Sequence, residues 1–165
     1  MAFKSINEIE KFRFDDCQIS RFEVNEQGIE LELEALIVKA DNSQNANYTE
    51  SYAATTRMQL VSGKILHGKK DGYKYYDAND VLISEVADTE LTEDELGVFP
   101  KQCAGAYLYE MKKESEAEDG FAYTLGIEFE DPEDGTVGDS YRLRVAFVKA
   151  VVTWERYMNR VQTGQ

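Results

Sequence analysis

Residues 29–37 read Ile-Glu-Leu-Glu-Leu-Glu-Ala-Leu-Ile, and this stretch decides the fold class. Its apolar and acidic side chains alternate, so that every odd-numbered residue is apolar and Glu occupies the first three even positions. A period of two is typical of a β-strand with one buried face and one solvated face. From Leu36 to Val38 both faces become apolar, which predicts that this end of the strand is covered on both sides.

Turn signals and further alternating segments surround this strand. Asn25-Glu26-Gln27-Gly28 predicts a hairpin turn before it, and the Asn-rich residues 41–50 predict a loop after it. More strands with the same period are expected at 52–60, 73–76, 81–86, 106–111, 121–129 and 141–152. A total of about seven to nine short strands, neighbours in sequence, favours antiparallel pairing. The chain is therefore predicted to be mainly β, with residues 1–165 forming a single-domain antiparallel β-sandwich or barrel.

Two short helices are expected beside the strands. Ser5-Ile6-Asn7-Glu8 has the spacing of a capping box, which predicts a helix near the N-terminus. Thr92-Glu93-Asp94-Glu95 is a second capping box and predicts a helix around 92–97. Because Gly97 and Pro100 follow closely, this second helix is expected to be short.

Slips in the alternation predict where the strands are irregular. The apolar positions change parity around Asp15-Asp16 and again around Ser20-Arg21, which indicates β-bulges. The charged residues 112–120 predict a hairpin loop. The predicted core consists of apolar residues from the alternating strands: Ile29, Leu31, Leu33, Ile37, Met58, Leu60, Leu125, Ile127, Leu143, Val145, Phe147 and Val148.

The composition restricts the classes of partner. The chain has 165 residues, 42% of them hydrophobic, and 18 Lys and Arg against 32 Asp and Glu give a net charge of −14. A chain of this length buries enough surface to fold without a metal or a disulfide. The negative charge opposes binding to a nucleic-acid backbone or to an anionic membrane, and favours basic protein partners or cations.

The motifs of the common catalytic and cofactor sites are missing from the sequence. His67 is the only histidine, no serine lies in a Gly-x-Ser-x-Gly motif, and neither Cys17 nor Cys103 belongs to a Cys-x-x-Cys pair. We therefore expect no enzyme, no cofactor and two reduced, inert thiols. The first twelve residues lack the apolar run of a signal peptide, which predicts a cytoplasmic protein without a membrane segment.

One stretch of the acidic chain is locally basic. Residues 67–76, His-Gly-Lys-Lys-Asp-Gly-Tyr-Lys-Tyr-Tyr, combine lysines with tyrosines, and Gly68 and Gly72 indicate turns. Basic and aromatic residues together bind single-stranded nucleic acid or sugars in some proteins, but the charge of the whole chain opposes a nucleic-acid site. The alternative is a solvated hairpin in which the lysines pair with carboxylates and the odd-numbered tyrosines face the core. The candidate binding residues are Lys69, Lys70, Tyr73, Lys74 and Tyr75.

A second candidate site is acidic. Residues 114–139 contain ten Asp and Glu and no Lys or Arg, gathered in the segments 114–119 and 128–139. Calcium takes six to eight oxygen ligands from such loops, although the EF-hand spacing fails when it is aligned on Gly135. A calcium site shared between loops would use Asp131, Asp134 and Asp139, with Asp77, Asn79 and Asp80. The alternative is a pair of solvated hairpin tips.

Two functional hypotheses follow from these residues. The first is a non-enzymatic acidic β-domain that binds a basic protein, as an adaptor, an inhibitor or an immunity-type protein does; a homodimer stays open as an alternative. The second is a β-sandwich that binds a small ligand, calcium or a carbohydrate, through its acidic loops and its ten tyrosines.

Overall fold

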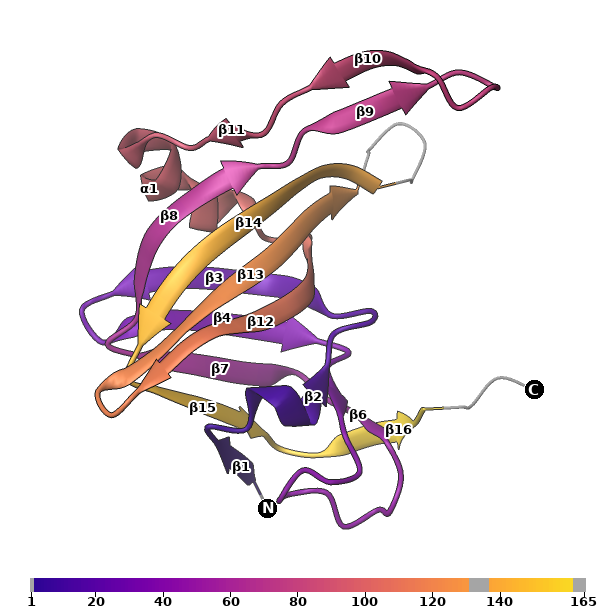
Figure 1. Ribbon diagram of the computed structural model, residues 1–165. Coiled ribbons are helices and arrows are strands. Elements are labelled where there is room, and N and C mark those ends of the chain that lie inside the picture. The colour runs from indigo at the N-terminus through magenta and orange to yellow at the C-terminus, as the bar shows by residue number, and fades with distance from the viewer. Residues whose placement is uncertain (1, 131–136, 162–165) are drawn as a thin grey trace.

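The fold is that of a mainly β protein. We describe residues 2–130 and 137–161 of a computed structural model (Figure 1). Ten strands form one antiparallel sheet in the order β1-β15-β7-β4-β3-β12-β13-β14-β8-β11. Their bounds are β1 Phe3–Ile6, β3 Gln18–Asn25, β4 Gly28–Glu34, β7 Thr56–Val61, β8 Lys64–Lys70, β11 Thr89–Glu90, β12 Tyr107–Ala117, β13 Gly120–Glu130, β14 Val137–Phe147 and β15 Lys149–Trp154.

Smaller elements complete the chain. A four-stranded sheet has the order β16-β6-β5-β2, and a separate two-stranded sheet consists of β10 and β9. No helix among the described residues combines the length and apolar character required to cross a membrane. The bounds of these strands and of the helices are β2 Phe12–Arg13, β5 Ile37–Val38, β6 Ser51–Ala53, β9 Tyr73–Tyr76, β10 Leu82–Val86, β16 Tyr157–Arg160, η1 Ile9–Lys11 and α1 Glu93–Gln102.

The large sheet bends into two facing layers, so the sandwich prediction is confirmed. One layer contains β15, β7, β4 and β3, and the other contains β12, β13, β14 and β8, whose strands cross over the first (Figure 1). Two strand pairs turn the corner between the layers, from β7 to β8 and from β14 to β15, and the Val148 N–H donates to the Val61 carbonyl there at 2.9 Å. Such corners are typical of sandwiches with crossed strands. Within the described residues the sheet ends at β1 and β11 and does not close.

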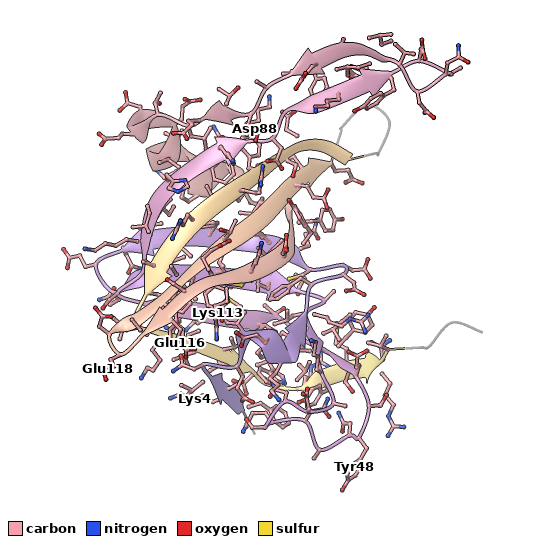
Figure 2. All side chains as sticks on the ribbon, viewed as in Figure 1. Lys4, Tyr48, Asp88, Lys113, Glu116 and Glu118 are labelled. Atoms are coloured by element: carbon pink, nitrogen blue, oxygen red, sulfur yellow. The ribbon has the colours of Figure 1, made fainter. Side chains whose placement is uncertain are left out.

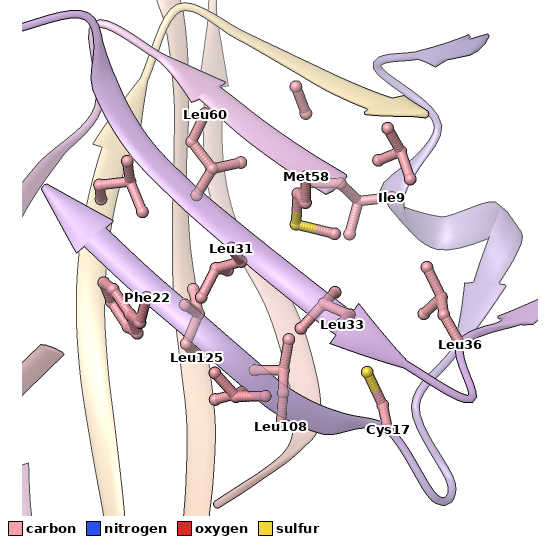
Figure 3. Close-up of a cluster of buried hydrophobic side chains, with 14 of the residues drawn as sticks. Ile9, Cys17, Phe22, Leu31, Leu33, Leu36, Met58, Leu60, Leu108 and Leu125 are labelled. Atoms are coloured by element: carbon pink, nitrogen blue, oxygen red, sulfur yellow. The ribbon is translucent and has the colours of Figure 1, made fainter. Parts of the chain in front are cut away.

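The core lies between the two layers. Side chains of β3, β4 and β7, among them Phe22, Leu31 and Met58, pack against Leu108 and Leu125 of β12 and β13 (Figure 3). All residues of the predicted core are buried except one. The prediction for Val148 is wrong, because this residue is 52% exposed. The single strand predicted over residues 141–152 is divided into β14 and β15, and Val148 lies at the corner between them.

Only one of the two predicted capping boxes begins a helix. Thr92 caps α1, with both hydrogen bonds of the box formed to Glu95. The prediction that this helix stops at Gly97 is wrong, because Phe99 packs on the aromatic rings of β13 and β14 and this tertiary contact outweighs the cost of Gly and Pro in the helix. At the N-terminus Ser5 belongs to β1, and the helical turn η1 begins only at Ile9.

Strand ends differ from the predictions at several places. The strand predicted over residues 29–37 ends at Glu34, because Ala35 adopts a positive φ of 59° and the next residues join the small sheet. The bulge at Ser20 is confirmed by a register shift between Ile19 and Arg21. The other predicted bulge, at 15–16, is instead a bend between β2 and β3.

The largest correction concerns residues 112–120. They were predicted to form a hairpin loop, but β12 continues to Ala117 and pairs with β13 throughout. Cross-strand pairs such as Lys113 with Tyr123 show the reason, because one face of this charged strand lies beside an apolar neighbour. Charge alone therefore does not end a strand whose partner is strongly β-forming.

Candidate functional site

One hairpin leaves the sandwich and projects from it. We call residues 73–86, with strands β9 and β10, the arm (Figure 1). β9 continues the direction of β8, and β10 leads into β11. The turn at its tip is held by Asp77, whose Oδ1 accepts from the backbone N–H groups of Asn79 at 2.8 Å and Val81 at 3.0 Å. Local hydrogen bonds of this kind are the reason that Asp favours turns.

The arm exposes an unusual amount of apolar surface. Every residue from 73 to 90 is exposed, and the large apolar side chains of the arm are between 44% and 65% exposed. Half of the exposed large hydrophobic residues in the described part of the chain lie in these fourteen positions, namely Tyr73, Tyr75, Tyr76, Val81, Leu82, Ile83 and Val86. Single exposed apolar residues are ordinary, but a contiguous group marks an interaction site.

The two faces of the arm differ in charge. The strand register places Tyr73 opposite Val86 and Tyr75 opposite Ser84, so these four side chains make an uncharged face. The rings of Tyr73 and Tyr75 pack edge to face with centroids 5.0 Å apart. On the other face Lys74 lies opposite Glu85, with 3.8 Å between Nζ and Oε1.

The base of the arm is fixed by a polar cluster, which we call the base clamp: Lys69, Asp71, Gly72, Asp88 and Arg142. The Gly72 N–H donates to Asp88 Oδ1 at 2.7 Å, and the Arg142 Nε donates to Asp71 Oδ1 at 2.7 Å. Arg142 also reaches Asp88 Oδ2 at 3.3 Å, and Lys69 lies 3.5 Å from the same oxygen. The backbone N–H of Gly72, with the nearby Lys69 and Arg142, lowers the pKa of Asp88 below its ordinary value. The clamp therefore ties the arm to β14 through charge-assisted hydrogen bonds.

Backbone contacts at the base leave no room for a side chain. A Cβ at position 72 would lie 1.9 Å from the Val86 carbonyl oxygen, so only glycine fits. The neighbouring Asp71 N–H donates to the Ser140 carbonyl at 2.8 Å, which extends the β14 pairing to the last residue before the arm. The orientation of the arm is thus determined by close packing as well as by charge.

The lysines of the basic patch pair with carboxylates, as the alternative of a solvated hairpin expects, but the two glycines differ from the prediction. Lys69, Lys70 and Lys74 lie within 4 Å of Asp88, Asp139 and Glu85, respectively. Gly68 and Gly72 do not form turns. Gly68 is buried in β8, where a Cβ would meet Leu143 at 2.6 Å.

The tyrosines of the patch are on the surface. Tyr73 and Tyr75 are exposed, so the expectation that odd-numbered tyrosines face the core is wrong, because no layer covers this part of the ribbon in the described residues. The apolar residues of β10 were missed as part of the site. Their signal was present in the sequence as the apolar strand 81–86, but a strand pattern alone does not say whether a face is covered.

The predicted calcium ligands do not come together among the described residues. Asp139 lies 3.3 Å from Lys70, and Asp77 uses a side-chain oxygen in the turn at the arm tip. Asp131 and Asp134 lie outside the described residues. Over 2–130 and 137–161, no group of three or more His, Cys, Asp or Glu side chains has a geometry suited to a metal ion.

The two cysteines are buried and unpaired. Burial raises the pKa of the Cys103 thiol to about 12 and also raises that of Cys17. A thiol with a raised pKa is rarely ionised and is a poor nucleophile. His67, in contrast, lies exposed on β8.

Fold and site together define an acidic antiparallel β-sandwich with a projecting apolar hairpin. A scan against protein-family models matches no family. A search of curated proteins finds no significant match. A search of solved structures also finds no significant match.

Proposed function

We propose that this protein is a non-enzymatic binding module that recognises a basic protein partner through the arm. The observation that carries the proposal is the exposed apolar surface of β9 and β10. A two-stranded hairpin has little stability of its own in water, and exposed aromatic and aliphatic residues on it favour contact with another molecule. Tyrosines in particular supply large contact area and often carry the binding energy of an interface.

The sign of the partner's charge follows from the charges around the arm. The three lysines of the predicted binding set are each paired with a carboxylate, so they leave little free positive charge. The chain as a whole carries −14. A partner with an apolar patch rimmed by Lys and Arg would be attracted over long range and bound at short range.

The proposal places the protein among adaptors, inhibitors or immunity-type proteins, which act by occupying a partner's surface. Its setting is the cytoplasm, where buried, unpaired cysteines such as Cys17 and Cys103 remain reduced.

The test is affinity capture from host lysate, at low and at high salt, with three forms of the tagged protein. The first is the natural sequence, and the second is the arm variant Tyr75→Ser/Ile83→Ser. The third is the control Val148→Ser, which alters an apolar residue of similar exposure at a corner of the sheet. Captured proteins are identified by mass spectrometry, and the binding constant of a purified partner is then measured for each form.

A stoichiometric basic partner that the arm variant loses and the control retains would support the proposal. Capture should also weaken at high salt, because the screening length is only about 8 Å near 0.15 M salt and shorter at higher concentration. A partner that binds all three forms equally would contradict the assignment to the arm. Absence of any stoichiometric partner would contradict the function itself.

A second candidate function, the binding of a small ligand, has one observation in its favour. A groove of about 570 Å³ lies between α1 and the β3–β4 turn, with Val24, Ile65, Leu96 and Pro100 among its lining residues. Its apolar lining suits an apolar ligand better than calcium or a carbohydrate. The melting temperature of the protein, measured with calcium, monosaccharides or apolar carboxylates, tests this second function, since a ligand that binds the folded state raises the melting temperature. A set of unshifted melting curves would contradict it.

A further inference from the structure

The outer edge of the arm is continuous with the outer edge of the large sheet. β11 is the last strand of the ten-stranded sheet, and β10, which precedes it in the chain, pairs only with β9. Within the described residues, no strand pairs with the outer side of residues 82–90. Alternate backbone N–H and C=O groups of this segment therefore point away from the protein, ready to pair with another strand.

The side chains of this edge do not protect it in the usual way. Residues 82–90 read Leu-Ile-Ser-Glu-Val-Ala-Asp-Thr-Glu, with three acidic residues and no Lys, Arg or Pro. Natural proteins block exposed edges with lysines, prolines or strong bulges, because an open edge pairs with other chains. A register shift between Leu82 and Ser84 disturbs the start of this edge, but the pairing from Ser84 to Glu90 keeps one register against β9 and β8. The inner strand β9 contains Lys74, and β12, which pairs with β3 only at Tyr107, contains Lys112 and Lys113. The outer edge of the arm is thus apolar and acidic where other strands carry lysine.

From this geometry we propose that the segment Leu82–Glu90, which we call the acceptor edge, receives an extended segment of the basic partner as an added antiparallel β-strand, the more stable pairing per residue. The inference rests on the proposed function and specifies how the partner is recognised. Backbone hydrogen bonds to β10 and β11 provide affinity, and alternate side chains provide specificity. Val86 and Ser84, on the uncharged face of the arm, favour apolar residues on the same face of the added strand. Glu85, on the opposite face, favours Lys or Arg there.

The base clamp makes the acceptor edge suitable for this role. Asp88 lies within the edge and is held by Gly72, Arg142 and Lys69, so the edge is ordered before binding. An edge that is already extended loses little conformational entropy when a strand is added. The charge of the chain disfavours a second copy as the occupant, because two copies would each bring −14 and the same acidic edge.

The experiment uses the full chain and synthetic peptides in place of the partner. The main probe is a capped ten-residue peptide of alternating lysine and valine. Two further peptides have the same sequence, one with N-methyl groups on the valines and one with N-methyl groups on the lysines. Because N–H groups of successive residues in a strand point to opposite edges, each modified peptide loses the donors of one edge only.

Affinity is measured by calorimetry, and the contact is located by hydrogen exchange of the backbone amides. We expect the unmodified peptide to slow exchange in residues 82–90, and one methylated peptide to bind at least about tenfold more weakly than the other. The variant Glu85→Gln should weaken binding. The control Glu118→Gln changes the net charge equally, and Figure 2 shows Glu118 well apart from Asp88, at the side of the molecule. It should bind like the natural sequence.

Three results would overturn the inference. Equal binding of the two methylated peptides would mean that charge alone attracts the peptide, and absence of binding by the unmodified peptide would mean that the edge accepts no basic strand. Protection of residues 82–90 without peptide, together with a dimer in sedimentation, would assign the edge to a second copy. None of these results decides whether the arm binds a partner in lysate, because that capture depends on Tyr75 and Ile83 side chains, so failure of the strand-addition mode is distinguishable from failure of the proposed function.

Discussion

The arm and the β12–β13 hairpin are both antiparallel ribbons, but the first exposes apolar side chains and the second exposes charged side chains. The outer part of the β12–β13 hairpin, residues 112–119, is Lys-Lys-Glu-Ser-Glu-Ala-Glu-Asp, while the outer part of the arm is rich in Tyr, Val, Leu and Ile. The apolar residues of β13, including Tyr123, Leu125 and Ile127, are buried in the core. Those of the arm are not. Charged side chains protect the outer part of the β12–β13 hairpin from association with other chains, but the arm lacks this protection. This difference indicates that the arm, and not the β12–β13 hairpin, is the site of apolar contact with a partner.

The two hairpins are also attached differently. β13 is held by the core and by a hydrogen bond from the Tyr123 hydroxyl to Glu10 Oε1 at 2.7 Å. The arm is held by the base clamp, whose charged side chains are between 23% and 43% exposed and are polar throughout. Contacts with few buried apolar groups open locally at low cost. Changes in the base clamp should therefore affect the arm without affecting the core.

The largest effect is expected in the core hairpin. Leu125→Ala removes a fully buried side chain and leaves a cavity, so the free energy of unfolding should fall by about 2–5 kcal/mol. The matched change in the arm, Leu82→Ala, should alter it by less than about 0.5 kcal/mol, because Leu82 is 45% exposed. Urea unfolding of both variants measures the difference. Similar losses would mean that the arm belongs to the cooperative core.

The next effect is local to the arm. Gly72→Ala forces a Cβ against the Val86 carbonyl oxygen, 1.9 Å away, so the arm should separate from its base. Hydrogen exchange of residues 73–88 should become at least about tenfold faster, while exchange in β13 stays unchanged.

The control for this change is Gly97→Ala, where a Cβ would meet no atom within 4 Å. It should stabilise α1 by up to about 1 kcal/mol, since Ala is the better helix former. Faster exchange in β13 of Gly72→Ala would contradict the independence of arm and core.

A smaller effect is expected from pH. The folded-state pKa of Asp88 is lowered, chiefly by the Gly72 N–H, so its contribution is fully present above the unfolded value near 4 and is lost as pH falls below it through the folded pKa. Arm amides should therefore exchange more readily, relative to the intrinsic rate, at pH 3 than at pH 6. Asp88→Asn should remove most of that difference. A pH response that survives in this variant would assign it to another carboxylate.

The smallest effect is expected at the ion pair between the two strands of the arm. Lys74 and Glu85 are both about half exposed and 3.8 Å apart, and pairs of this kind contribute about 0–1 kcal/mol. Lys74→Met should leave the melting temperature nearly unchanged, while the same change at Lys113, which bridges Glu10 and Glu116, should lower it slightly. A large loss from Lys74→Met would show that the arm depends on this pair.

The sequence by itself determined most of the local structure. Alternation predicts β4 and β13, the Asn25–Gly28 turn connects β3 with β4 as expected, and the Thr92 capping box begins α1. These features depend on residues close together in the chain, and their preferences act over a few residues. The mainly β fold class and the negative net charge also follow from the sequence alone. Of the site, the sequence indicated the lysines and tyrosines of β8 and β9, including Lys69 of the base clamp, but not the β10 residues or the other members of the clamp.

The tertiary structure alone decided which alternating segments became core and which became surface. Residues 81–86 and 121–129 both have strand patterns, yet the first is exposed on the arm and the second is largely buried. Val148 looked like a core residue but lies at a corner, and Gly68 looked like a turn but is buried opposite Leu143. The physical reason is that burial depends on the second layer and on strand register, which are set by contacts between residues far apart in the chain.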